Sequence, residues 1–159
     1  MITVVTDGGD GHRLEHSDGS FAGTIRNGVI RVGAFDTESE LFAAALALWT
    51  ALDTTLRHQF PGWPSYKPDP RAIRLVHDGA YEWVSDGRRP LARVIRPTRR
   101  AYYDVLRLEF VLPTYATEGE IVAAAVAVVK ALERFHAEHE HTTWLPLVTE
   151  HVPDADPAS

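Results

Sequence analysis

Two stretches of the chain share one spacing of hydrophobic and polar positions, and that spacing is typical of an amphipathic helix. Residues 37–52 (TESELFAAALALWTAL) align without a gap with residues 117–132 (TEGEIVAAAVAVVKAL), and nine of the sixteen positions are identical. In both stretches a threonine is followed three residues later by a glutamate, which is the pattern of a capping box. We therefore expect helices that begin at Thr37 and Thr117 and run for about 20 residues each.

The apolar face of each predicted helix is wide, because a second row of apolar residues lies beside the main one. Such helices are covered on two sides, and we expect a sheet to cover one of them. The many alanines allow a close approach on the other side. We expect the other helix there, and a second subunit in a homodimer is the alternative.

The rest of the chain alternates with the period of two that predicts strands. Asn27-Gly28 lies between two such runs and favours a type I′ turn, since both residues tolerate positive φ angles. In the run at 102–112 the alternation points Leu108 and Phe110 inward, and Arg107 and Glu109 outward. The predicted strands are 2–5, 13–16, 20–25, 29–32, 72–77, 81–84, 91–96 and 102–112, with one more edge strand at 143–148.

These elements predict an α+β fold with two similar halves. Each half is an antiparallel strand meander followed by one long amphipathic helix, and both helices pack on the sheet. The halves are residues 1–61 and 72–150, joined by a proline-rich connection at 62–71 and followed by a disordered tail at 151–159. Duplication of one unit explains the match between the helices. Convergence of two alanine-rich helices is the alternative, because alanine supplies five of the nine identities.

The composition is that of a globular domain, with 45% hydrophobic and 24% charged residues among 159. The absence of cysteine excludes disulfides, thiolate metal sites and cysteine nucleophiles. The sequence opens on a strand pattern rather than a signal peptide, and no apolar stretch is long enough to span a membrane. We therefore expect a cytoplasmic protein that does not contact a membrane.

Positive charge is concentrated in one short segment. Six arginines lie within thirteen residues, and no acidic residue lies between Asp86 and Asp104, although the whole chain has a formal net charge of −6. Guanidinium groups suit carboxylates and phosphates, and an aromatic ring nearby offers a stacking surface. The candidate binding residues are Arg88, Arg89, Arg93, Arg96, Arg99, Arg100 and Tyr102. The alternative is that these arginines pair with local acids on a solvated hairpin.

Histidine forms a second cluster at the end of the second predicted helix. His136, His139 and Glu140 have the spacing that places them on one side of a helix, where two imidazoles and a carboxylate could hold zinc. Exposed histidines are also common at a helix end, where the helix dipole favours their charged form. We therefore predict no metal or cofactor, and a solvated helix end at this position.

The chain contains no nucleophile elbow, phosphate-binding Walker loop, dinucleotide fingerprint or His-Glu-x-x-His motif. We therefore favour a non-catalytic binding protein, whose arginine-rich surface contacts an acidic protein or a phosphate-bearing ligand, without sequence-specific recognition of nucleic acid. One alternative is a small-molecule pocket between sheet and helices, lined by Trp49, Trp63, Trp83 and Trp144. Another is an enzyme of unrecognised type that uses a metal at His136 and His139.

Overall fold

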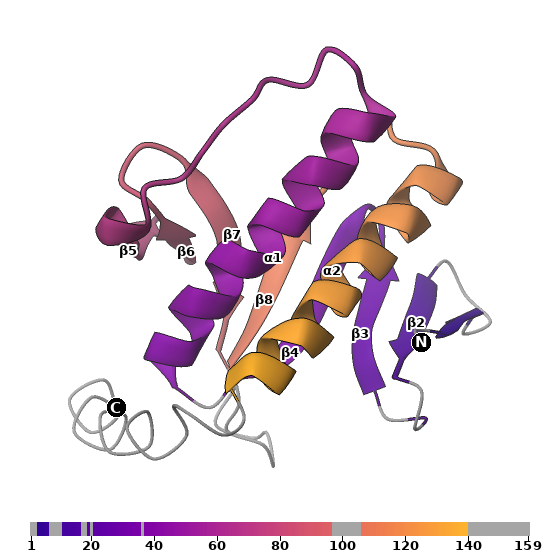
Figure 1. The fold of residues 1–159 in the computed structure, drawn as a ribbon, viewed down its shortest axis with the longest axis horizontal. Coiled ribbons are helices and arrows are strands. Elements are labelled where there is room, and N and C mark those ends of the chain that lie inside the picture. Colours follow the sequence, from indigo (N-terminus) through magenta and orange to yellow (C-terminus); the bar gives the residue numbers. More distant parts are fainter. Residues whose placement is uncertain are drawn as a thin grey trace.

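The computed structural model describes residues 3–6, 11–16, 19, 21–35, 37–96 and 106–139. These residues form one eight-stranded antiparallel sheet, two α-helices and a short 3-10 helix at Pro70–Ala72, so the predicted α+β class is confirmed. Both helices lie side by side on the same face of the sheet (Figure 1). The predicted edge strand at 143–148 and the tail at 151–159 lie outside the described residues.

The strand order is β1-β2-β3-β4-β8-β7-β6-β5. The two meanders therefore meet where β4 pairs with β8, and β1 and β5 are the edges. All strands belong to one sheet, so the strand order does not by itself divide the chain into two halves. The strands are β1 (Thr3–Thr6), β2 (Gly11–Glu15), β3 (Phe21–Arg26), β4 (Val29–Phe35), β5 (Arg74–Asp78), β6 (Tyr81–Ser85), β7 (Pro90–Ile95) and β8 (Leu106–Val111).

The hairpin predicted from Asn27-Gly28 is confirmed. Asn27 has a φ of 53° and Gly28 a φ of 73°, which are the positive angles that a type I′ turn requires. The turn joins β3 to β4 and sets their register, in which Thr24 pairs with Arg31 and Arg26 with Val29. Because side chains alternate across a strand, this register places all four residues on the same face of the sheet.

The two predicted helices are confirmed as α1 (Glu38–Gln59) and α2 (Glu118–His139). The Thr37 hydroxyl accepts a hydrogen bond from the backbone N–H of Glu40 at 3.0 Å. At Thr117 the reciprocal capping box is complete, since the Glu120 carboxylate also accepts from the Thr117 backbone N–H at 2.8 Å. These capping bonds satisfy backbone N–H groups in the first turn and so fix where each helix begins.

Replacing Thr117 with alanine removes the side-chain half of this box, and we expect a loss of about 1 kcal/mol in the free energy of unfolding. Urea denaturation measures it. Thr54→Ala, at an exposed position within α1, is the control and should be neutral or slightly stabilising, because alanine is the better helix former. An equal loss in both variants would show that the capping bond contributes nothing specific.

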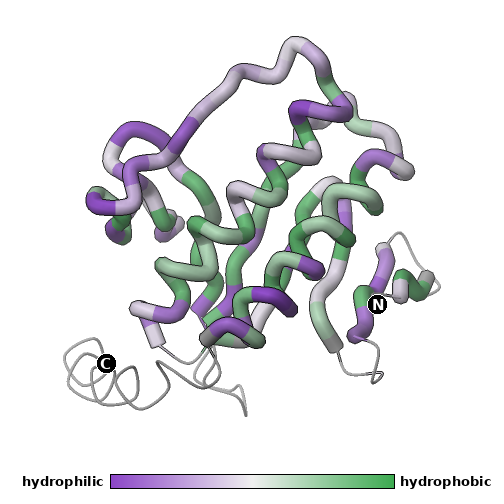
Figure 2. The backbone as a smooth tube through the Cα atoms, in the orientation of Figure 1, coloured by the Kyte–Doolittle hydropathy of each residue, from purple (hydrophilic) through white to green (hydrophobic). Residues whose placement is uncertain are grey.

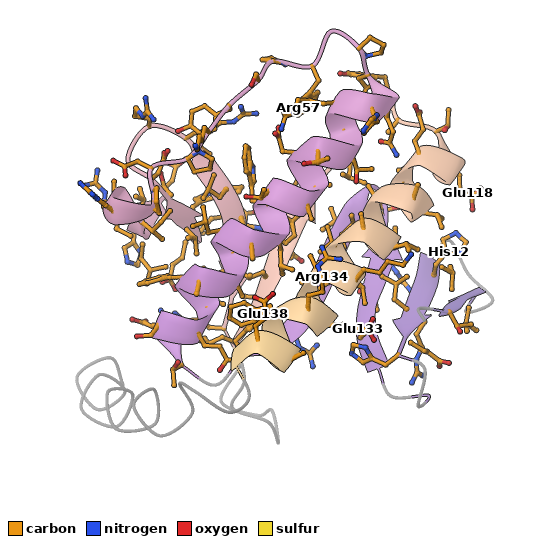
Figure 3. All side chains as sticks on the ribbon, viewed as in Figure 1. His12, Arg57, Glu118, Glu133, Arg134 and Glu138 are labelled. Atoms are coloured by element: carbon orange, nitrogen blue, oxygen red, sulfur yellow. The ribbon has the colours of Figure 1, made fainter. Side chains whose placement is uncertain are left out.

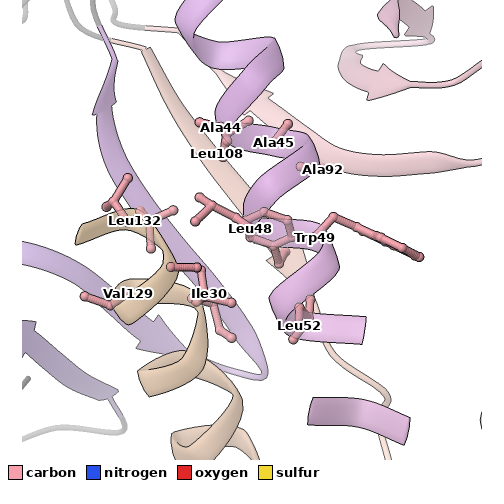
Figure 4. Packing of buried hydrophobic residues seen from close by; sticks show 14 of the residues in the cluster. Ile30, Ala44, Ala45, Leu48, Trp49, Leu52, Ala92, Leu108, Val129 and Leu132 are labelled. Carbon is pink, nitrogen blue, oxygen red and sulfur yellow. The ribbon is translucent and has the colours of Figure 1, made fainter. Parts of the chain in front are cut away.

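The core lies between the helices and the sheet. Leu48 and Ile30 face Val129 and Leu132 there (Figure 4), and all four are buried. The helices run antiparallel and contact each other directly, with Ala44, Ala45, Ala124 and Ala125 fully buried. The expected close approach of the two helices is therefore confirmed within the chain. Both helices alternate between hydrophobic and hydrophilic positions along their length (Figure 2).

Candidate functional site: the open face of the sheet

The face of the sheet opposite the helices is the candidate site, because both helices of the described chain cover the other face. Cross-strand pairing places one row of side chains across its centre: Trp83 pairs with Arg93, Arg93 with Glu109, and Glu109 with Arg31. The row continues through Thr24 and Arg13 to Val5 at the β1 edge. We call this side of the sheet the open face.

Glu109 is the centre of the row, and its side chain is buried although it points away from the helices. Alternation along β8 correctly turns its side chain away from the helices, but the carboxylate is 3% exposed rather than solvated. Arg31 donates to Oε2 through Nε at 2.8 Å and Nη2 at 2.5 Å. Arg93 donates to Oε1 through the same two atoms at the same distances. The flanking guanidinium groups cover the carboxylate on both sides.

The protonation of Glu109 follows from these contacts. Burial alone would raise the pKa of Glu109, but the hydrogen bonds from Arg31 and Arg93 and their positive charges lower it by more. The carboxylate is therefore ionised at neutral pH. Two arginines and one carboxylate leave the cluster with one net positive charge, fixed in place on the open face.

Aromatic and aliphatic groups surround this cluster. The guanidinium carbon of Arg93 lies 4.7 Å from the ring centroid of Tyr81 and 5.8 Å from that of Trp83, within the range of cation–π contacts. Tyr81 is 53% exposed, and Val111, two residues beyond Glu109 on β8, is 57% exposed. The open face therefore combines cationic and exposed apolar groups.

The charge of the open face is opposite in sign to that of the chain. Over β2, β3, β4, β7 and β8 its charged residues give a net +3, in a chain of formal net charge −6. If residue 33 carried a Cβ atom, that atom would lie 2.7 Å from the Cγ atom of Arg107. Glycine at this position therefore leaves room for the Arg107 side chain. The charged residues of these strands on the open face are Arg13, Arg26, Arg31, Arg93 and Arg107, with Glu15 and Glu109.

A hollow lies on this face next to the Asn27-Gly28 turn, with a volume of about 510 Å³. Its walls include Arg26, Arg31, Arg93 and Glu109, and Asn27 and Thr24 add polar groups. The hollow has the size of a small-ligand site and more basic than acidic groups.

The predicted arginine cluster is spread over different parts of the molecule. Arg88 and Arg89 lie in the β6–β7 turn, over the ring of Tyr66 at 5.5 Å and 5.2 Å. Arg93 lies on the open face. Arg96 donates to Glu82 at 2.6 Å and to Glu38 at the start of α1 at 2.9 Å, so it joins the sheet to a helix. Arg99, Arg100 and Tyr102 lie outside the described residues.

The pKa values of the Arg96 cluster fit a structural role. The hydrogen bond from Arg96 lowers the pKa of Glu82, and the same bond raises the pKa of Arg96. Both groups therefore remain charged over the whole range of physiological pH. Of the four described candidates, Arg93 alone belongs to the open-face row.

The predicted histidine cluster lies only partly within the described residues. His136 stacks on Phe35 with a centroid separation of 6.2 Å, whereas the His139 side chain and Glu140 lie outside the described part. Within the described residues, no group of three histidines and acids could hold a metal ion. Two other histidines contact α2: His12 Nε2, on β2, lies 2.8 Å from Glu118 (Figure 3), and His16 Nδ1, in the residue after β2, lies 2.9 Å from Glu133.

Comparisons with family models, with curated proteins and with solved structures found no match to this chain. None of the described helices has the length and apolar character needed to cross a membrane.

Proposed function

We propose that this protein is a non-catalytic binding protein whose open sheet face contacts an acidic protein partner. The observation that carries the proposal is the Arg31–Glu109–Arg93 row, in which one buried carboxylate orients two guanidinium groups at the centre of that face. A guanidinium group held in this way loses little conformational entropy when it binds a carboxylate of another protein. Its fixed orientation therefore favours binding of an acidic partner.

The size and composition of the open face support a protein partner. Eight strands at about 4.8 Å spacing, each about 17 Å long, give an area of roughly 600 Å². Each partner in a standard protein interface contributes about 800 Å². Tyrosine, tryptophan and arginine are also the residues enriched at such interfaces, and Tyr81, Trp83 and Arg93 lie together here.

The sign of the charge argues for an acidic partner rather than a second copy bound face to face. Two faces of net +3 would repel each other, and like charges placed together cost several kcal/mol in an interface. An acidic surface would approach the open face with the electrostatic attraction that raises association rates.

We expect Val111→Asp to weaken binding of a fluorescein-labelled polyglutamate peptide by about tenfold, because it adds a negative charge beside the arginine row. Fluorescence anisotropy measures the affinity, which should also fall with added salt. Tyr115→Asp is the matched control, since Tyr115 is 67% exposed but lies outside the sheet. Equal weakening in both variants, or equally tight binding of polylysine, would contradict the proposal.

A phosphate-bearing ligand is the second candidate, and the hollow beside Arg26, Arg31 and Arg93 favours it. Phenyl phosphate should then displace the polyglutamate peptide from the wild-type protein at concentrations at which phenol does not. Displacement by neither compound would leave the acidic protein as the partner.

We also infer that the chain arose by duplication. In support, β1 to β4 followed by α1 has the same order as β5 to β8 followed by α2, and the order within the sheet is the same from either edge inward. The capping threonines Thr37 and Thr117 are equivalent in this arrangement, as are the central strands β4 and β8.

A further inference from the structure

A second cavity lies on the outer side of α1, away from the open face. Its volume is about 410 Å³, and it separates the helix from the proline-rich connection at 62–71. The helix contributes residues spaced by three or four positions, which therefore lie on one side of α1. The lining is Leu46, Trp49, Thr50, Asp53 and Arg57 from α1, and Ser65, Tyr66, Lys67, Pro68 and Pro70 from the connection.

The connection is held on both sides of this cavity. Trp63 Nε1 donates to the Asp53 carboxylate at 3.0 Å, next to Arg57 on the outer flank of α1 (Figure 3). Further along, the Tyr66 hydroxyl donates to Asp86, and the Tyr66 ring meets Trp49 edge to face at a centroid distance of 5.7 Å. These two attachments hold the connection in place, so the cavity between it and α1 is a fixed feature of the fold.

The walls of the cavity are aromatic and aliphatic. Trp49 leaves α1 on the side away from Leu132 (Figure 4), and its ring, which is 7% exposed and part of the hydrophobic core, also lines this cavity. Leu46, Pro68 and Pro70 add aliphatic surface. A flat apolar group fits such walls, because aromatic rings favour stacked or edge-to-face contacts with it.

The charged groups of the cavity select an anion. The Asp53 carboxylate is 2% exposed, and its two oxygens accept from Trp63 and Arg57, so the charge of Arg57 balances that of Asp53 and Lys67 leaves the cavity with one net positive charge. Lys67 is exposed, and within the described residues it forms no ion pair. The ammonium group of Lys67, together with Arg57 at 45% exposure, can therefore receive a carboxylate from solution.

We propose that this cavity binds a small carboxylic acid with a flat aromatic body. The ring lies against Trp49 and Tyr66, and the carboxylate contacts Lys67 and Arg57. The volume lies within the range of about 300–1,000 Å³ typical of ligand sites. This site is separate from the open face and does not depend on the function proposed for it.

The test is a titration of the intact protein with 3-phenylpropionate, followed by tryptophan fluorescence and by calorimetry. We expect saturable binding of 3-phenylpropionate that is tighter than binding of hexanoate, and no binding of 2-phenylethylamine. Lys67→Gln should weaken the affinity for 3-phenylpropionate at least about tenfold, the effect of losing a charge-assisted hydrogen bond. Lys130→Gln, at an exposed position on α2, is the matched control and should bind like the wild type.

A second pair of variants tests the position of the site without changing charge. Thr50→Phe places a ring in the cavity and should abolish binding, whereas Thr54→Phe, one turn further along the exposed side of α1, should not. The proposal is overturned if 3-phenylpropionate does not bind, if 2-phenylethylamine binds as well, or if either control loses as much affinity as its partner variant. Tighter binding of hexanoate would refute the aromatic body.

Discussion

Replacing Arg31 and Arg93 together with methionine should lower the free energy of unfolding by about 3–5 kcal/mol, the cost of leaving a buried charge without its partner. The Glu109 carboxylate is 3% exposed and, within the described residues, accepts four side-chain hydrogen bonds, two from each of these arginines. Adding Glu109→Gln to the double variant should restore part of the loss, because the unpaired charge is then gone. Urea denaturation at neutral pH measures all three proteins. No recovery in the triple variant would show that the arginines act by packing alone.

The same cluster predicts a dependence on pH. The pKa of Glu109 is lowered in the folded protein from its ordinary value of 4.5, so the unfolded chain takes up the proton first on acidification. The stabilisation from this group is therefore complete above pH 4.5 and is lost as the pH falls through the lowered pKa. Glu109→Gln should show a flatter loss of stability than the wild type on the acid side of pH 4.5. Parallel curves for the two proteins would contradict this.

Replacing Asp86 with alanine should cost about 2–4 kcal/mol, because it leaves several hydrogen-bond donors without an acceptor. The buried carboxylate accepts from the backbone N–H groups of Arg88 at 3.0 Å, Arg89 at 2.9 Å and Asp69 at 3.2 Å, and from the Tyr66 hydroxyl. Burial would raise the pKa of Asp86, but these bonds hold it well below its usual range. Asp86 thus fixes the β6–β7 turn and the proline-rich connection at once.

Asp86→Asn is the matched control, since the amide keeps the shape and one acceptor oxygen, and it should lose less stability than the alanine variant. Thermal unfolding followed by circular dichroism compares the two. The alanine variant should also bind 3-phenylpropionate more weakly, because Tyr66 loses its attachment. A change in stability below about 0.5 kcal/mol, as at an ordinary surface position, would refute the role of Asp86.

Local features of the fold could be predicted from the sequence because their physical causes are local. The capping threonines fix where both helices begin, and Asn27-Gly28 fixes one hairpin. The alternation along 102–112 gave the right face for Glu109 but did not predict its burial between two arginines, since strand alternation does not reveal which strands become neighbours. β4 and β8 are joined across 78 residues between Arg31 and Glu109, and no short pattern indicates that pairing.

Because strand pairing cannot be read from a short pattern, the residues of the candidate site could be predicted only in part. Arginines close in sequence were expected to form one binding surface. The alternation along β7 and the turn before it place their side chains on different parts of the molecule instead. Arg93 lies on the open face, Arg96 binds Glu38 at a helix start, and Arg88 lies over Tyr66. Arg31 was overlooked because it is isolated in the sequence. It joins Arg93 only through Glu109, once the sheet has formed.

The most direct measurement for the central claim is a map of backbone amide chemical shifts during titration of the wild-type protein with the polyglutamate peptide. If the open face binds acidic partners, the shifts should concentrate at Arg31, Arg93, Glu109 and their cross-strand neighbours, and the outer sides of α1 and α2 should stay unchanged. Shifts confined to the helices, or no saturable shifts on β4, β7 and β8, would contradict the claim.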